Sequence, residues 1–398
     1  MTKAKDFLAV LGDLGGYAKK LETYRDLIVG NIIRVGEESS VLPDPPIDPS
    51  VDPFLGNERA RAFGERLLEI GIDECSIDGA GNPVGIIKGR KASAPPILVA
   101  AEIDSKYQPD WDWHYSVSAE AIKGPGVTDN AVAAACLVTI ADLARLEDMT
   151  FDSDIYLVGF ANTTVPGNDY GAIDRFLANL GQKTRGALIL KGTELGRVNY
   201  FTRATLRATI ACERKDEEDR QNMILVGHEI LEGLLAIRLP QKPSTELIVG
   251  KFSGGAKFGS PAECCEMGIE LRSDSTDILD ELASRLADVV ESVGLERGVN
   301  ASLRVKSRRG AKNIGYDHPL TRASLSALAS LGVEPAVSAS YSELFFFLDR
   351  GVAAITLGMT EGRRQQTDEA EALIAPLYKG LAQIVGLLRT MDGGLCDA

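Results

Sequence analysis

Histidine is scarce in this sequence: only His114, His228 and His318 occur among 398 residues. Neutral imidazole is the commonest protein ligand for zinc and related metals, so the chain offers little material for a histidine-ligated centre. No histidine follows His318. A metal held by the C-terminal part of the chain would therefore depend on oxygen ligands.

Three further absences each exclude a class of protein. The net charge is −14 and the longest basic stretch, 304–309, is short, so neither nucleic acid nor an anionic membrane is expected as a partner. No apolar run approaches the length of about 20 residues that spans a bilayer, and the N-terminus has no secretory signal. Six cysteines without a CxxC spacing predict buried free thiols in the reducing cytoplasm.

Strands and helices alternate along most of the chain. This alternation predicts an α/β fold of three layers, with helices on both faces of a mainly parallel sheet. An amphipathic helix with Phe7, Leu8, Leu11 and Leu14 near one face, and a Pro- and Asp-rich surface connection over 39–56, precede it. The expected helices are 61–70, 132–146, 170–180, 318–331 and 371–388, and the expected strands are 75–89 (a pair), 97–103, 154–160, 186–190 and 353–357.

The pattern changes between residues 205 and 306. Strand, helix, two strands, helix and strand follow one another there, which is the order of a ferredoxin-like α+β module. The α/β style resumes at 318. We therefore expect one α/β domain made of 1–202 and 313–398, with a ferredoxin-like domain over 203–312 inserted into it.

Four pieces in this order give the chain a resemblance to a known family. They are Gly81–Gly89, the strand that ends at Asp104, the Gly126–Asp129 turn and Val352–Gly358. Together with the inserted module they resemble the zinc-dependent exopeptidases and deacylases, a family that includes acetylornithine deacetylase, succinyl-diaminopimelate desuccinylase, glutamate carboxypeptidases and peptidase T. The resemblance implies the two-domain fold, a homodimer formed through the inserted lid, and two zinc ions that activate a bridging water.

Three acidic residues match positions of the family's metal site. Asp129 corresponds to the aspartate that bridges the two zinc ions. Asp104 corresponds to the catalytic-site aspartate that orients the first histidine ligand. Glu102 stands where that histidine is expected.

The other family positions carry residues that cannot do the same work. No glutamate lies between Asp154 and Glu194, so the paired glutamates that supply a general base and a ligand are missing. Lys191 replaces a carboxylate ligand, and an ammonium has no lone pair to donate. Gln366 replaces the last histidine, just before Thr-Asp-Glu.

These replacements leave two readings of the site open. In the first, Lys191 neutralises the carboxylates, no cofactor binds, and the chain is a pseudoenzyme that takes a peptide or amino-acid-like ligand. In the second, Glu102, Asp104 and Asp129 hold an oxygen-ligated Ca²⁺, Mg²⁺ or Mn²⁺ ion, and the chain hydrolyses peptides or N-acyl amino acids. His114, in the aromatic loop after Asp104, would supply a replacement ligand. Arg363, in the loop before Gln366, would clamp a substrate carboxylate.

Overall fold

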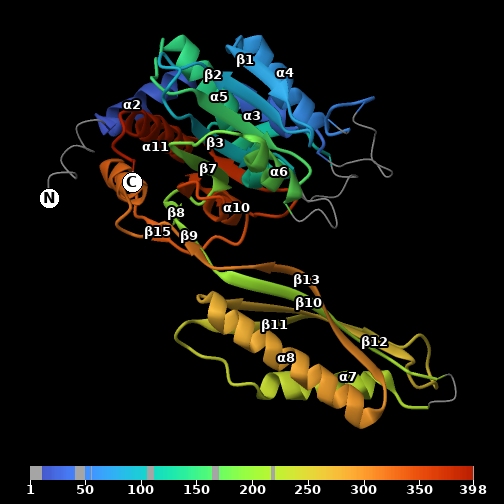
Figure 1. Ribbon diagram of the computed structural model, residues 1–398. Helices are drawn as coiled ribbons and strands as arrows, with labels where there is room; N and C mark the ends of the chain where they lie inside the picture. Colours follow the sequence, from blue (N-terminus) through green and yellow to red (C-terminus); the bar gives the residue numbers. More distant parts are fainter. Residues whose placement is uncertain are drawn as a thin grey trace. The chain divides into compact units, whose positions relative to one another are not determined.

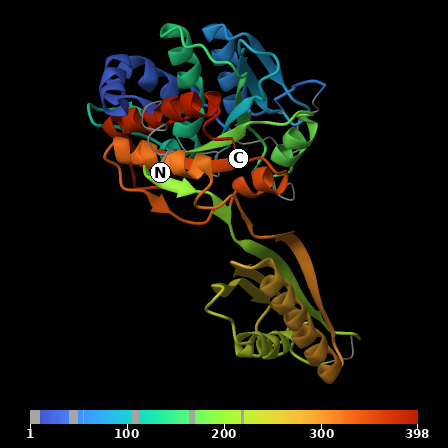
Figure 2. The ribbon, with the colours of Figure 1, turned by 60° about the vertical axis from the view of Figure 1, so that its left-hand side comes forward.

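The computed structural model describes residues 11–40, 50–54, 56–104, 112–163, 170–216 and 220–397. The chain divides into two compact units (Figures 1 and 2). One comprises Met1–Tyr200 with Ile314–Ala398, and the other comprises Phe201–Asn313. Half of the predicted N-terminal amphipathic face (Phe7 and Leu8) and most of the connection over 39–56 lie outside the described residues. Helix α2 (Leu14–Leu21) is capped by Asp13, whose side chain accepts a hydrogen bond from the Gly16 amide.

The larger unit is built on an eight-stranded sheet in the order β1-β2-β6-β3-β7-β16-β8-β15. Its centre is parallel, because β6, β3, β7 and β16 all run the same way, while β1 and β2 pair antiparallel with their neighbours. β8 pairs antiparallel with β16 and parallel with β15. The mainly parallel sheet expected from the sequence is therefore confirmed. The strands are β1 (Glu74–Ile77), β2 (Pro83–Ile87), β3 (Ile97–Glu102), β6 (Ile155–Phe160), β7 (Gly186–Thr193), β8 (Arg197–Asn199), β15 (Ala336–Val337) and β16 (Ala354–Thr360).

Helices cover both faces of this sheet, and the alternation along β3 shows it. Ile97, Val99 and Ala101 join the core beneath one helical layer, whereas Leu98 and Ala100 join a second core on the opposite face. The first layer is α2, α3 (Arg25–Gly36), α4 (Glu58–Ile70), α5 (Val132–Leu146), α9 (Pro319–Ser330) and α11 (Ile374–Asp392). The second layer is α6 (Gly171–Asn179) and α10 (Leu344–Asp349).

Helix α5 is the most apolar helix of the larger unit. With the turn before it, the segment Val127–Leu146 is long and apolar enough to cross a membrane by length and composition alone, contrary to the expectation that no run comes close. In the structure 94% of its most apolar window is buried. The run is apolar because α5 packs against α3, α4 and the sheet, as expected for a central helix.

The structure contains short elements that the sequence did not predict. β4 (Ser116–Val117), β5 (Ala121–Lys123), β17 (Gly362–Arg363) and β18 (Glu371–Leu373) form a small antiparallel sheet. Strands of two or three residues show too few alternations to be recognised from the sequence. This sheet joins the loop after Asp104 to the loop that contains Gln366.

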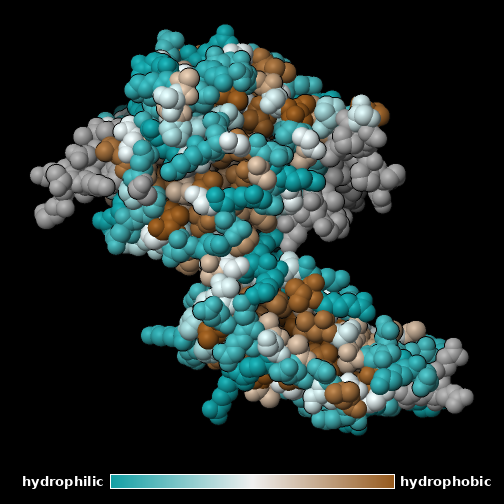
Figure 3. All heavy atoms as spheres, in the orientation of Figure 1, coloured by the Kyte–Doolittle hydropathy of each residue, from teal (hydrophilic) through white to brown (hydrophobic). Residues whose placement is uncertain are grey.

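The second unit has the expected ferredoxin-like order. Its sheet runs β11-β12-β10-β13, with β10 (Ala204–Glu213), β11 (Thr245–Gly254), β12 (Cys264–Ser273) and β13 (Asn300–Arg309) all antiparallel to their neighbours. α7 (Met223–Ala236) and α8 (Thr276–Arg297) cover one face and enclose a core of their own. Two short strands, β9 (Phe201–Thr202) and β14 (Lys312–Asn313), pair at its ends. Figure 3 shows mostly hydrophilic residues over the visible face of each unit, with apolar side chains in patches.

The cysteines are free thiols. Cys136 and Cys265 are buried as expected, whereas Cys264 is exposed because the alternation of β12 turns it to the other face. Cys212 lies opposite Cys265 across the β10–β12 pair. Burial, with a smaller effect of Cys265, raises the pKa of Cys212 to about 11 and so favours its thiol form.

The contact between α11 and β16 is tight enough to exclude a side chain. A Cβ added at Gly380 would lie 1.9 Å from the Met359 carbonyl oxygen. We expect Gly380→Ala to lower the free energy of unfolding by about 1–3 kcal/mol in urea titrations, because the helix must move off the strand. Gly30→Ala, in an open position of α3, is the control and should be neutral or stabilising. Equal effects at the two positions would contradict this packing account.

Candidate functional site

The candidate site lies at the carboxyl ends of the central parallel strands, where open α/β sheets commonly place ligands. β3 ends at Glu102, and the parallel register that pairs Ala100 with Ile189 brings Lys191 of β7 to the same level. Side chains alternate along a strand, so Glu102 and Lys191 both project from the face that α6 and α10 cover. Glu343 stands directly before α10 on that same face.

An ion-paired cluster joins these three side chains. Lys191 Nζ lies 2.8 Å from Glu102 Oε1 and 3.0 Å from Glu343 Oε1. The Glu343 side chain is fully buried, the Glu102 side chain is 6% exposed and the Lys191 side chain 20%. The pairing of Lys191 with a carboxylate agrees with the first reading of the sequence. Its second partner, Glu343, was not expected.

The pKa values of the cluster follow from burial and from these charges. Burial alone would raise the pKa of Glu102, but the Lys191 ammonium and several hydrogen bonds hold it at about 2. Burial raises the pKa of Glu343 to about 7; Lys191 opposes this shift and the negative charge of Glu102 adds to it. Burial would lower the pKa of Lys191, yet the two carboxylates shift it above its ordinary range. The cluster thus holds Lys191 as an ammonium and Glu102 as a carboxylate, and it favours the protonated form of Glu343 relative to an exposed glutamate.

Asp104 is buried, and its carboxylate is occupied by protein donors. Asn57 Nδ2 donates to Oδ1 at 2.8 Å, and the Thr163 amide donates to Oδ2 at 2.6 Å. The Thr163 hydroxyl lies 3.2 Å from that same Oδ2 and 3.0 Å from Glu102 Oε2. The side-chain amide of Asn130 donates through Nδ2 to the backbone carbonyl of Asp104. These contacts tie the end of β3 to α4, to the loop after β6 and to the start of α5.

Asp129 enters from the other helical layer, in the turn Val127–Ala131 just before α5. Its backbone leaves the helical region, with φ −97° and ψ −114°. Gly192 of β7 packs against this turn so closely that an added Cβ would lie 2.0 Å from the Asp129 carbonyl oxygen. The side chain of Asp129 is half-buried.

The donor set does not fit two zinc ions. Lys191 places a positive charge against Glu102, where a dication would have to sit, and its ammonium has no lone pair to offer a metal. Within the described ranges no group of three or more His, Cys, Asp or Glu side chains could hold a metal ion. The residues of this site therefore do not support a reaction step that requires bound metal.

His114 lies on the surface. Its side chain is 88% exposed, and Nδ1 lies 3.1 Å from Asp112. The residues beside it pack on the α3–α4 side: the Arg59 guanidinium lies 5.5 Å from the Trp113 ring centre, and Tyr115 Oη lies 2.9 Å from the Gly36 carbonyl oxygen. The structure therefore places His114 at the surface, and its role as a replacement ligand stays a prediction. The remainder of this loop, 105–111, lies outside the described residues.

Gln366 and Arg363 are also exposed. Arg363 lies in β17 opposite Glu371, and Gln366 sits in the following turn with a positive φ of 62°. The neighbouring Arg364 pairs with Glu369 at 2.7 Å rather than joining Arg363 in a clamp. Neither Gln366 nor Arg363 enters the buried cluster of Glu102, Lys191 and Glu343.

Sequence reasoning missed Glu343, Thr163 and Asn57. Glu343 is 152 positions from Lys191, and no spacing rule joins two such distant residues. One signal was present, because Glu343 directly precedes the apolar run Leu344–Leu348, where an unpartnered glutamate would be costly. Thr163 lies in the segment where the family's paired glutamates were sought and not found.

The whole architecture recurs in solved peptidase structures. The chain is similar to an aminopeptidase PepT from Bacillus cereus, with TM-score 0.73 and 14% identity over 92% of this chain and 98% of that one. It is similar to a tripeptidase from Staphylococcus aureus, with TM-score 0.73 and 14% identity over 93% and 99%. A dinuclear metal-binding M20 peptidase from Bacillus subtilis matches with TM-score 0.64 and 12% identity over 92% and 98%. The fold is that of the M20 peptidases.

The M20 fold confirms the architecture that the resemblance implied, including the inserted lid. It does not extend to sequence: no protein-family model matches the chain, and no curated protein matches it. At 12–14% identity the likeness concerns the fold alone. The chemistry of the site depends on its own residues, Glu102, Lys191 and Glu343.

Removal of the ammonium should destabilise the protein strongly. We expect Lys191→Met to lower the free energy of unfolding by roughly 3–5 kcal/mol, because it leaves two buried carboxyl groups without their counter-charge. The double variant Lys191→Met/Glu102→Gln should recover more than half of that loss. Urea titrations measure both, with the exposed Lys183→Met as control. A loss no larger than that of the control would show that the ion pair contributes nothing.

Glu343 should make stability fall as pH rises. Its pKa is about 7 in the folded protein against 4.5 ordinarily, so the folded state binds more protons between these values. The free energy of unfolding should therefore decrease from about pH 4.5 to about pH 7 and lose nothing further from this group above that range. Glu343→Gln should flatten the dependence, whereas the exposed Glu120→Gln should not. An unchanged slope in Glu343→Gln would contradict this assignment.

Proposed function

We propose that this protein uses the M20 fold without the metal ions of M20 peptidases. The ammonium of Lys191 takes the place of the cation between Glu102 and Glu343. The observation that carries the proposal is the pair of contacts at 2.8 and 3.0 Å from Lys191 Nζ. A lysine held this way cannot ligate a metal, and it repels one.

The reaction chemistry of the fold is also incomplete. A dinuclear hydrolase needs metals that polarise the scissile carbonyl and acidify water. Thr163, not a glutamate, approaches Glu102 and Asp104 from the loop after β6, and its hydroxyl is already within hydrogen-bond distance of both carboxylates. We therefore propose a pseudoenzyme that binds rather than hydrolyses.

The ligand class follows from the proteins that share the fold. They include an aminopeptidase and a tripeptidase. We propose a small peptide or an amino-acid-like ligand for this chain on that basis. Figure 1 shows β3 and β7 running side by side through the larger unit, and the ligand would bind near their carboxyl ends.

The alternative function is an active hydrolase of peptides or N-acyl amino acids with an oxygen-ligated divalent ion. It requires Glu102 to exchange Lys191 for a metal ion. Metal content decides between the two. The purified protein is incubated with Zn²⁺, Mn²⁺, Ca²⁺ or Mg²⁺, passed through a desalting column and analysed for metal, beside Asp129→Ala.

We expect far less than one tightly bound metal ion per chain for each cation, and no difference between the wild type and Asp129→Ala. Lys191→Gln is the informative variant, since it removes the repulsion while leaving Glu102 and Glu343 in place. Any gain in affinity for a divalent ion should appear in this variant and not in Lys183→Gln. Stoichiometric metal in the wild type that is lost in Asp129→Ala would instead establish the metallohydrolase.

A further inference from the structure

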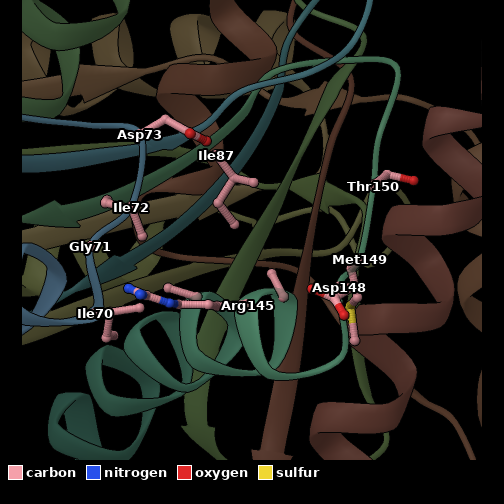
Figure 4. A pocket seen from close by; sticks show the side chains of 11 residues that line it. Ile70, Gly71, Ile72, Asp73, Ile87, Arg145, Asp148, Met149 and Thr150 are labelled. Atoms are coloured by element: carbon pink, nitrogen blue, oxygen red, sulfur yellow. The ribbon is translucent and has the colours of Figure 1, made fainter.

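A pocket lies in the larger unit, at the opposite end of α5 from the candidate site. It has a volume of about 300 Å³ and forms where α4, β2 and α5 all end (Figure 4). α5 has 15 residues, so its two ends are about 20 Å apart at 1.5 Å per residue. The pocket is therefore separate from Glu102, Lys191 and Glu343.

The floor of the pocket is apolar. Ala141 and Ala144 of α5 and Ile70 of α4 are buried there, and Ile72, Ile87 and Met149 are half-buried around them. Figure 4 shows the Ile87 and Met149 side chains among those that line the cavity. This volume is at the small end of the range for ligand pockets, so a single amino-acid-sized molecule would fill it.

Two opposite charges stand at the rim three residues apart. Arg145 and Asp148 are both exposed, and in the described part of the chain neither side chain has a hydrogen bond or an ion pair. Most arginines of this unit do have partners, as Arg66 has in Asp142. The Arg145 guanidinium instead reaches across to Gly71, where an added Cβ would lie 2.5 Å from Nη1.

The backbone around the pocket adds negative potential. α4 and α5 both end here, and carbonyl groups at a helix C-terminus favour a nearby cation. Asp73 also lines the rim, with one carboxylate oxygen accepting the Lys88 amide at 2.7 Å. The rim thus offers one guanidinium to an anion and several negative groups to a cation.

We propose that this pocket binds a free α-amino acid with an apolar side chain. Its carboxylate pairs with Arg145, which can bind it through two parallel hydrogen bonds. Its ammonium group pairs with Asp148 beside the helix ends, and its side chain occupies the floor of Ile70, Ile72 and Met149. The proposal rests on this pocket alone and is independent of what the Lys191 cluster does.

Isothermal titration of the full chain with L-leucine and L-methionine tests the proposal. We expect saturable binding that weakens by roughly tenfold or more in Arg145→Gln and in Asp148→Asn, each of which removes one charged partner. Arg175→Gln, an exposed arginine of α6 in the same unit, is the matched control and should bind as the wild type does. Thermal unfolding confirms that each variant is folded.

Two blocked ligands complete the test. N-acetyl-leucine lacks the ammonium group and leucinamide lacks the carboxylate, so each should bind roughly tenfold more weakly than leucine or not at all. Equal binding of all three would show a merely apolar pocket and overturn the proposal. Absence of saturable binding up to ~10 mM leucine, an affinity below any useful level, would overturn it as well.

Discussion

The two ion pairs that Lys191 makes with the buried Glu102 and Glu343 hold the candidate site together. Three neighbouring elements deliver the partners: β3 supplies Glu102, β7 supplies Lys191, and the start of α10 supplies Glu343. A buried carboxylate without a counter-charge is costly, so loss of the Lys191 ammonium alone should destabilise the protein. The ammonium thereby does structurally what a metal ion does in a dinuclear site, holding acidic groups together at the ends of the strands.

The surrounding contacts support this arrangement. Asn57 and Thr163 donate hydrogen bonds to the two carboxylate oxygens of Asp104, and Thr163 also contacts Glu102. The structure thus combines the fold of the M20 peptidases with a network of ion pairs and hydrogen bonds around Glu102 and Asp104. The fold alone therefore does not establish the chemistry of the site.

The sequence predicted the fold well because long elements carry strong patterns. Helix 132–146 and strand 186–190 match α5 and the first part of β7, and the order of elements over 205–306 indicated the lid. The short strands β4, β5, β17 and β18 escaped prediction because two or three residues hold no periodicity. The N-terminal helix over Phe7 and Leu8 stays a prediction.

The site was predicted only in part. Lys191 and Glu102 could be named from their matched positions, and their opposite charges indicated a pair. Glu343 could not, since only the packing of α10 against the end of the sheet brings it to Lys191. Gln366 and Arg363 were placed at the site by resemblance and His114 by its position in the loop after Asp104, and the structure leaves all three exposed. Loops diverge most freely among proteins of one fold, which is why positions in them transfer poorly.

Anomalous X-ray diffraction from crystals grown with excess Zn²⁺ tests the central claim most directly. The account predicts no zinc peak among Glu102, Asp104 and Asp129, and electron density for the Lys191 ammonium between Glu102 and Glu343. A zinc peak at about 2.0–2.2 Å from these carboxylate oxygens, with the Lys191 side chain displaced, would contradict it.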